Sequence, residues 1–231
     1  MSQTGLNLTA ITIFTVVMMS LLGPVLNISP VIPALGIFSL LGVATLDNFS
    51  FQGRGSTLLL DWFASFSAEH RDRVVRHEAG HFLVAHLLGI PITGYTLTAW
   101  EAFQQGQTGR GGVSFDCQEL DAQVEQGAIS AQLVDRYCKV WMAGIAAETL
   151  IYGKSEGGAD DREKFGILWA QLHRPEAEGL QKLNWSAFQA KTLIQSHWSA
   201  YEALVAAMQK RAAVLECCDA IERTSSVSQA Q

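Results

Sequence analysis

The sequence predicts a mainly α-helical protein that contains one small β-hairpin and is preceded by an N-terminal transmembrane hairpin. Apolar residues recur at three- and four-residue steps through much of the chain, and two of these stretches stop at a glycine. No Asp, Glu, Lys, Arg or His occurs before Asp47, which sets the N-terminal part apart from the rest. The length of 231 residues suits one ordinary domain plus this additional segment.

Residues 1–50 are predicted to form the membrane segment. The run Leu8–Leu26 is uncharged and largely apolar, and about 20 helical residues cross a hydrocarbon core of about 30 Å. The shorter run Val31–Leu46 contains one proline and two glycines. It fits a second span, a re-entrant piece or a helix at the membrane surface. A cleaved signal peptide is disfavoured because residues 1–7 hold no Lys or Arg. We therefore expect one or two transmembrane helices in contact with membrane lipid.

The positive charges that follow this segment predict its orientation. Nothing basic precedes the apolar runs, whereas four arginines come soon after them: Arg54, Arg71, Arg73 and Arg76. Positive residues beside membrane helices favour the cytoplasmic side. We expect a polar linker at residues 51–66 to lead to a domain in the cytoplasm or in an equivalent compartment such as a stroma.

Residues 67–222 are predicted to form that domain. Ser67 is the expected N-cap of its first helix, which ends at Gly89 and Pro91. The stretch 92–100 is rich in β-branched and aromatic residues and predicts a strand, with a return strand at residues 112–115. The remainder is expected to be helical at residues 130–152 and 161–173 and from Asn184 to about Leu215, followed by a disordered tail at residues 223–231.

The first helix of the domain carries a complete H-E-x-x-H motif at residues 77–81. Because side chains at positions i and i+4 lie on one face of a helix, His77 and His81 can bind one zinc ion. Glu78 stands beside them, where it can take a proton from water at the metal. Gly80 lies inside this helix at a cost of up to about 1 kcal/mol relative to alanine, which a close approach of the backbone to another element or to substrate would explain.

Composition excludes two other classes of site. The net charge is −6 and no cluster of Lys and Arg occurs, so we expect no nucleic acid as a partner. The four cysteines show no C-x-x-C spacing. They fit reduced thiols, and a zinc–thiolate site is not expected.

A catalytic zinc needs a third protein ligand and one open position, and the residues offer three routes to it. The metzincin extension fails because Val84 and Leu87 occupy the positions of its Gly and His. Glu101 has the spacing of a thermolysin-like ligand but lies in strand-like sequence. The third route is an acidic residue far downstream, which the segment Gly157-Gly158-Ala159-Asp160-Asp161 provides.

Three motifs in order resemble the protease domain of the FtsH family of membrane-anchored zinc metalloproteases. They are the H-E-A-G-H at residues 77–81, the Gly144–Glu148 stretch that leads to Gly153, and the Gly157–Asp161 segment. The resemblance covers about residues 68–218. It implies a helical zincin-type domain, a peptide or protein substrate, and a third zinc ligand that closes a T-G-A-S-N-D segment at the start of a helix. Setting residues 156–161 against that segment places the ligand at Asp161.

The departures from the family pattern also carry expectations. Glu156, Ala159 and Asp160 replace the Thr, Ser and Asn of the family segment. Asp160 could compete for the metal or hydrogen-bond a ligating histidine. Family members normally carry an AAA ATPase module, but no G-x-x-x-x-G-K-[ST] occurs in this chain.

The resemblance therefore implies a free-standing, ATP-independent zinc metalloendopeptidase that is anchored in a membrane and hydrolyses unfolded or membrane proteins. Glu78 is the expected catalytic base, and His77, His81 and Asp161 are the expected zinc ligands. Two alternatives stay open. One is a proteolytic subunit that works with a separate AAA ATPase in trans. The other is a catalytically idle scaffold or regulator of membrane protein quality control, against which the intact motif weighs. Relatives form rings, so a homo-oligomer is also open.

Overall fold

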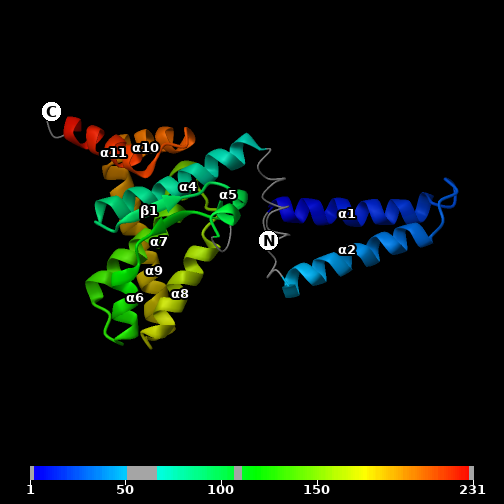
Figure 1. The fold of residues 1–231 in the computed structure, drawn as a ribbon, viewed down its shortest axis with the longest axis horizontal. Coiled ribbons are helices and arrows are strands. Elements are labelled where there is room, and N and C mark those ends of the chain that lie inside the picture. Colours follow the sequence, from blue (N-terminus) through cyan, green and yellow to red (C-terminus); the bar gives the residue numbers. More distant parts are fainter. Residues whose placement is uncertain (1–2, 51–66, 107–110, 229–231) are drawn as a thin grey trace. The chain divides into compact units, whose positions relative to one another are not determined.

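The computed structural model describes residues 3–50, 67–106 and 111–228 (Figure 1). It is mainly helical and contains a two-stranded antiparallel sheet, as the sequence predicts. The chain divides into two compact units. One comprises Met1–His70 and Thr98–Gly111, and the other comprises Arg71–Leu97 and Gly112–Gln231. The linker predicted at residues 51–66 lies outside the described residues.

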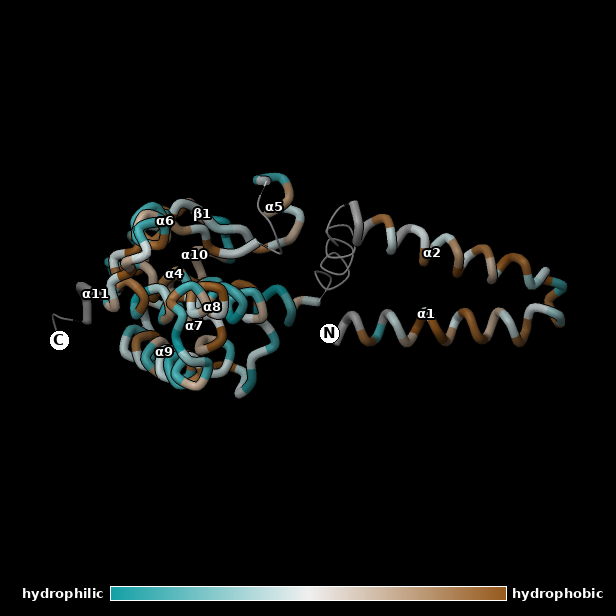
Figure 2. Tube along the Cα trace, turned by 90° about the horizontal axis from the view of Figure 1, so that it is seen from below, coloured by the Kyte–Doolittle hydropathy of each residue, from teal (hydrophilic) through white to brown (hydrophobic). Residues whose placement is uncertain are grey.

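The first unit contains a helical hairpin formed by α1 (Gln3–Leu22) and α2 (Val31–Ser50). A turn joins the two helices: the Ile28 N–H donates to the Gly23 carbonyl at 2.8 Å, and Asn27 adopts a φ of 55°. Figure 2 shows that apolar residues dominate both helices. Within the described residues, however, no helix is sufficiently long and apolar to cross a membrane. The expected hairpin is thus present, but the expected transmembrane spans are not found.

The short helix α5 (Ala99–Gln104) also belongs to the first unit and corrects one strand prediction. The strand expected at residues 92–100 ends at Tyr95. Thr98 then caps α5, because its hydroxyl accepts a hydrogen bond from the Glu101 N–H at 3.1 Å. Thr98 and Glu101 are three residues apart, the spacing of a capping box, and this local signal overrides the β propensity of the preceding residues.

The second unit contains most of the motif helix and the sheet. The motif helix α4 (Ala68–Leu87) is capped by Ser67, whose hydroxyl accepts from the His70 N–H at 3.3 Å. The strands β1 (Ile92–Tyr95) and β2 (Val113–Phe115) pair in antiparallel fashion. The helix α6 (Gln118–Glu125), which the sequence did not predict, follows β2.

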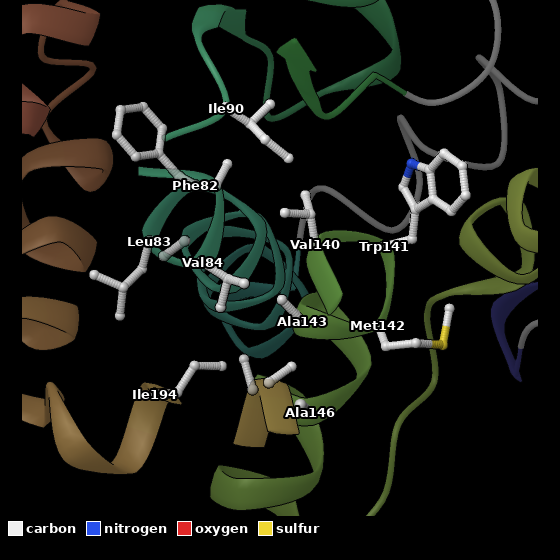
Figure 3. Close-up of a cluster of buried hydrophobic side chains, with 14 of the residues drawn as sticks. Phe82, Leu83, Val84, Ile90, Val140, Trp141, Met142, Ala143, Ala146 and Ile194 are labelled. Atoms are coloured by element: carbon white, nitrogen blue, oxygen red, sulfur yellow. The ribbon is translucent and has the colours of Figure 1, made fainter. Parts of the chain in front are cut away.

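The long helix α7 (Ala131–Tyr152) is the centre of this unit. Ser130 caps its start, and Gly153 ends it in the left-handed conformation with a φ of 75°. Both α8 (Ala159–Gln171) and α9 (Glu176–Ser196) pack against α7. Figure 3 shows the core where α4, α7 and α9 contribute apolar side chains, among them Phe82, Leu83, Val84, Val140, Met142, Ala143 and Ile194. Each large side chain buried there contributes about 1.5–3 kcal/mol.

The helix predicted from Asn184 to about Leu215 is wrong in its bounds. Its first part belongs to α9, which begins just after Pro175, eight residues before Asn184. The chain then leaves the helical conformation at His197 and continues as α10 (Trp198–Gln209) and α11 (Val214–Ser228). Between α10 and α11, Arg211 has a φ of 58°. The helix α11 extends to Ser228, into the tail that we expected to be disordered.

Candidate metal centre

The two motif histidines come together on the face of α4 that is turned toward α7. Their rings meet edge to face with centroids 4.7 Å apart. The Nε2 atoms of His77 and His81 are separated by 3.0 Å. Both residues are buried. One helical turn between the histidines therefore gives the convergent nitrogens that the motif predicts.

Asp161 completes a group of three possible ligands. Its Oδ2 lies 3.2 Å from His77 Nε2 and 3.3 Å from His81 Nε2. In the part of the chain that the structure describes, His77, His81 and Asp161 form the group whose donor atoms could hold a metal ion. Asp160 is exposed at the same helix start and is not a member of the group, and neither is Glu101.

The second ring nitrogen of each histidine is held by α7. His81 Nδ1 lies 2.7 Å from the Val140 carbonyl, and His77 Nδ1 lies 2.7 Å from Glu148 Oε1. A carbonyl and an ionised carboxylate only accept hydrogen bonds, so both Nδ1 atoms carry a proton. In the neutral imidazoles, Nε2 is then the atom with the free lone pair. Partners of this kind orient metal-ligating histidines in proteins.

This arrangement fits a bound cation. Two Nε2 lone pairs and a carboxylate oxygen point at one another, which is repulsive unless a positive charge lies between them. The donor separations of 3.0–3.3 Å match the edge of about 3.3 Å expected for a tetrahedron with metal–ligand distances of about 2 Å. A proton is the alternative positive charge. Burial opposes it, but hydrogen bonds to Asp161 and Glu148 raise the pKa of His77 to about 10.

Glu148 joins the centre to its surroundings. It is 1% exposed, and its carboxylate accepts from Arg73 at 3.1 Å and from the backbone N–H groups of Glu156 and Gly157 at 2.9 and 3.1 Å. Burial alone would raise the pKa of Glu148. The hydrogen bonds from His77 and the Glu156 N–H outweigh burial and lower this pKa to about 2. An ionised Glu148 therefore orients His77 and also holds the loop that leads to Asp161.

Glycines make room for the ligands. A Cβ on Gly144 would lie 2.3 Å from His77 Nε2 and 2.5 Å from His81 Nε2. A Cβ on Gly157 would lie 2.7 Å from Glu148 Oε1. Gly158 has a φ of 88°, and a Cβ there would lie 2.3 Å from Ile145. Only glycine fits at these points, which explains the glycine that begins the second motif and the two glycines that begin the third.

Glu78, the expected base, is half-buried and follows the first histidine directly. Its Oε2 accepts a hydrogen bond from the Val113 N–H of β2 at 3.0 Å. The sequence alone predicted neither this contact nor the contact of Arg73 with Glu148. Arg73 could have been found, since it lies one helical turn before His77. The contact of Val113 could not have been found, because nothing in the sequence around Val113 points to Glu78, 35 positions away.

No protein-family model matches this chain, and the curated proteins give no match either. The class that the fold and the site define is therefore a mainly helical protein with a candidate His–His–Asp metal centre.

Proposed function

We propose that the chain is a zinc metallopeptidase. The observation that carries the proposal is the convergence of His77 Nε2, His81 Nε2 and Asp161 Oδ2 in one buried group, with Glu78 as the residue after the first of them. Three protein ligands with one further position are typical of catalytic zinc, whereas structural zinc is usually enclosed by four. The resemblance of three ordered motifs to the FtsH protease domain supports the same reading.

The donor set supports zinc as the metal. Two imidazole nitrogens and one carboxylate oxygen suit zinc better than calcium or magnesium, which prefer oxygen ligands. When bound, zinc lowers the pKa of a coordinated water to about 7 and polarises a substrate carbonyl.

The residues of the chain have separate roles in peptide hydrolysis. Glu78 takes a proton from the attacking water and delivers it to the leaving amine. Glu148 and the Val140 carbonyl keep the Nε2 atoms of His77 and His81 directed at the metal. Asp161 supplies the negative ligand.

The wider setting stays a prediction. We infer an ATP-independent endopeptidase acting on unfolded or membrane proteins, with residues 1–50 in contact with membrane lipid and the protease domain on the cytoplasmic or stromal side. The alternatives are a proteolytic subunit fed by a separate AAA ATPase and an idle scaffold or regulator. Casein cleavage with and without ATP distinguishes them, because only the first reading gives a purified chain that is active without a partner.

The test of the proposal compares Glu78→Gln with Glu69→Gln. Both glutamates lie on α4, but Glu69 is exposed in the first turn. Removal of the base is expected to lower the rate of peptide hydrolysis by about 10²–10⁴-fold. Zinc content, measured by atomic emission, is expected to stay at the wild-type level because Glu78 is not a ligand.

Glu69→Gln controls for the loss of one negative charge from α4 and is expected to keep wild-type activity. Full peptidase activity in Glu78→Gln would refute the proposed mechanism. A wild-type protein that binds zinc but cleaves no peptide would favour the two alternatives, the subunit that needs a separate ATPase and the idle scaffold.

A further inference from the structure

The start of β2 makes a contact with Glu78 that metal binding does not require. The Val113 N–H donates to Glu78 Oε2 at 3.0 Å. Hydrogen bonds between a backbone N–H and an ionised carboxylate are among the strong ones in proteins. A carboxylate that must accept a proton from one defined water needs a fixed orientation.

The antiparallel pairing directs this N–H away from β1. The Gly112 carbonyl accepts from the Thr96 N–H at 3.0 Å, and the Asp116 N–H donates to the Pro91 carbonyl at 2.9 Å. These groups face β1. Backbone groups alternate in direction along a strand, so the Val113 N–H faces the outer edge of β2. At this outer edge, Glu78 accepts the hydrogen bond from the Val113 N–H.

Thr96 fixes the residue that precedes Val113. Its buried hydroxyl accepts from the Gly112 N–H at 3.0 Å, while its own N–H donates to the Gly112 carbonyl. Gly112 is thus held from both sides by one residue. The peptide unit that carries the Val113 N–H cannot rotate without breaking this pair.

Gly112 also lies close to the carboxylate. Its φ is 134°, and a Cβ there would lie 3.1 Å from Glu78 Oε2. A side chain would strain the backbone and also crowd Glu78. The small residue therefore brings the strand near enough for the Val113 N–H to reach the carboxylate.

We propose that Thr96, Gly112 and the Val113 N–H form a positioning device for Glu78, in which the sheet sets the orientation of the catalytic base. The inference rests on the proposed function, because Glu78 needs to be positioned only if it acts as a base. Thr96 and Gly112 act through the Val113 N–H and touch no reacting atom. They are positioning residues and not catalytic residues.

The first experiment measures the contact without relying on activity. Amide hydrogen exchange of the full chain is followed at Val113 in the wild type and in Glu78→Ala. Loss of the acceptor is expected to accelerate exchange at Val113 by roughly 10- to 100-fold. The Asp116 amide, which is bonded across the sheet to Pro91, is the internal reference and is expected to exchange at an unchanged rate.

The second experiment measures the catalytic consequence with Thr96→Val, which removes the hydroxyl at nearly constant volume. We expect kcat to fall by roughly tenfold while KM changes by less than about twofold and zinc content stays constant. Thr98→Val is the matched control, since it removes a hydroxyl–amide hydrogen bond that caps α5 and is expected to leave kcat unchanged. Thr96→Ser, which retains the hydroxyl, is expected to regain most of the lost kcat.

The outcomes separate the two proposals. Unchanged exchange at Val113 in Glu78→Ala, or an unchanged kcat in Thr96→Val, would overturn the positioning device and leave the peptidase proposal standing. A wild-type chain without peptidase activity would overturn the proposed function, and with it the catalytic meaning of the contact. The exchange result would then still decide whether the hydrogen bond exists.

Discussion

At the scale of single residues, the two neighbouring aspartates of α8 differ in one respect that decides their roles. Asp161 is buried with its Oδ2 within 3.3 Å of both histidine Nε2 atoms, whereas Asp160 is exposed. Burial would raise the pKa of Asp161, but with protons as the positive charge of the centre, the charge of His81 and the hydrogen bond from His77 hold this pKa well below its usual range. Asp161 therefore stays ionised and suits a cation.

We predict that Asp161→Asn lowers zinc affinity strongly and that Asp160→Asn does not. The amide lacks the negative charge, and one of the three donors is weakened. Zinc titration with a competing chelator should show a loss of at least about 100-fold for Asp161→Asn. The neighbouring variant makes the same chemical change at an exposed site and should match the wild type. Equal zinc affinity in the two variants would remove Asp161 from the ligand set.

Some residues of the metal centre could be predicted from the sequence and others could not. His77, Glu78 and His81 are local, since one helical turn brings the two histidines to one face and Glu78 follows the first of them directly. Asp161 followed only from a resemblance, because no local rule joins residues 80 positions apart. The sequence favours a structural or metal-supporting role for Glu148 over proton transfer. Its contact with His77, and that of Val113 with Glu78, depend on how α7 and β2 pack against α4, and no pattern in the sequence specifies that packing. Long-range contacts of this kind are fixed by the fold as a whole.

At the scale of elements, the close crossing of α4 and α7 depends on one glycine from each helix. A Cβ on Gly80 of α4 would lie 2.6 Å from the Ala143 carbonyl of α7. Gly144 of α7 leaves room for both imidazoles. The close approach inferred for Gly80 from the sequence alone is thus confirmed, and its partner is α7.

We predict opposite effects for Gly144→Ala and Gly166→Ala. The first places a methyl group against both histidine rings, so stability is expected to fall by about 1–3 kcal/mol and zinc affinity is expected to fall as well. Gly166 lies in α8 with nothing within 4 Å of an added Cβ, so alanine there should stabilise the protein by up to about 1 kcal/mol. Chemical denaturation and zinc titration measure both effects. A Gly144→Ala protein with wild-type zinc affinity would contradict the packing described for the centre.

The elements themselves were predicted where their end signals are strong. Ser130 and Gly153 bound α7 as expected, and Ser67 begins α4. The apolar stripe that was read as one helix continues across the break at His197, because α10 keeps a buried face of its own. The spacing of apolar residues indicates which residues are buried, but it does not indicate where one helix ends and another begins in a new direction. The boundary at His197 therefore could not be found from spacing alone.

At the scale of the molecule, a metal ion would join segments that are far apart in the chain. The two histidines belong to α4, and Asp161 belongs to α8. A ligand that binds only the folded state stabilises it according to its concentration relative to the dissociation constant. The centre is therefore expected to contribute to global stability as well as to chemistry.

We predict that removal of zinc lowers the melting temperature. At a free zinc concentration 100 times the dissociation constant, the stabilisation is about 2.7 kcal/mol, which corresponds to roughly 5–10 °C for a chain of this size. Thermal unfolding followed by circular dichroism, with chelator and after re-addition of zinc, measures the shift. Removal of zinc should change the melting temperature of Asp161→Asn much less. A change equal to that of the wild type would show that the stabilising zinc binds elsewhere.

The shared hydrogen bonds of Glu148 have a consequence for how metal enters and leaves. One carboxylate holds His77 and also the backbone of Glu156 and Gly157, just before the helix that carries Asp161. If His77 or Asp161 moves away from the metal, it must disturb contacts of Glu148 that also restrain the other ligand. Dissociation should therefore be cooperative, with few molecules holding metal through two ligands only. We therefore expect a bound ion to exchange slowly, even where the equilibrium affinity is moderate.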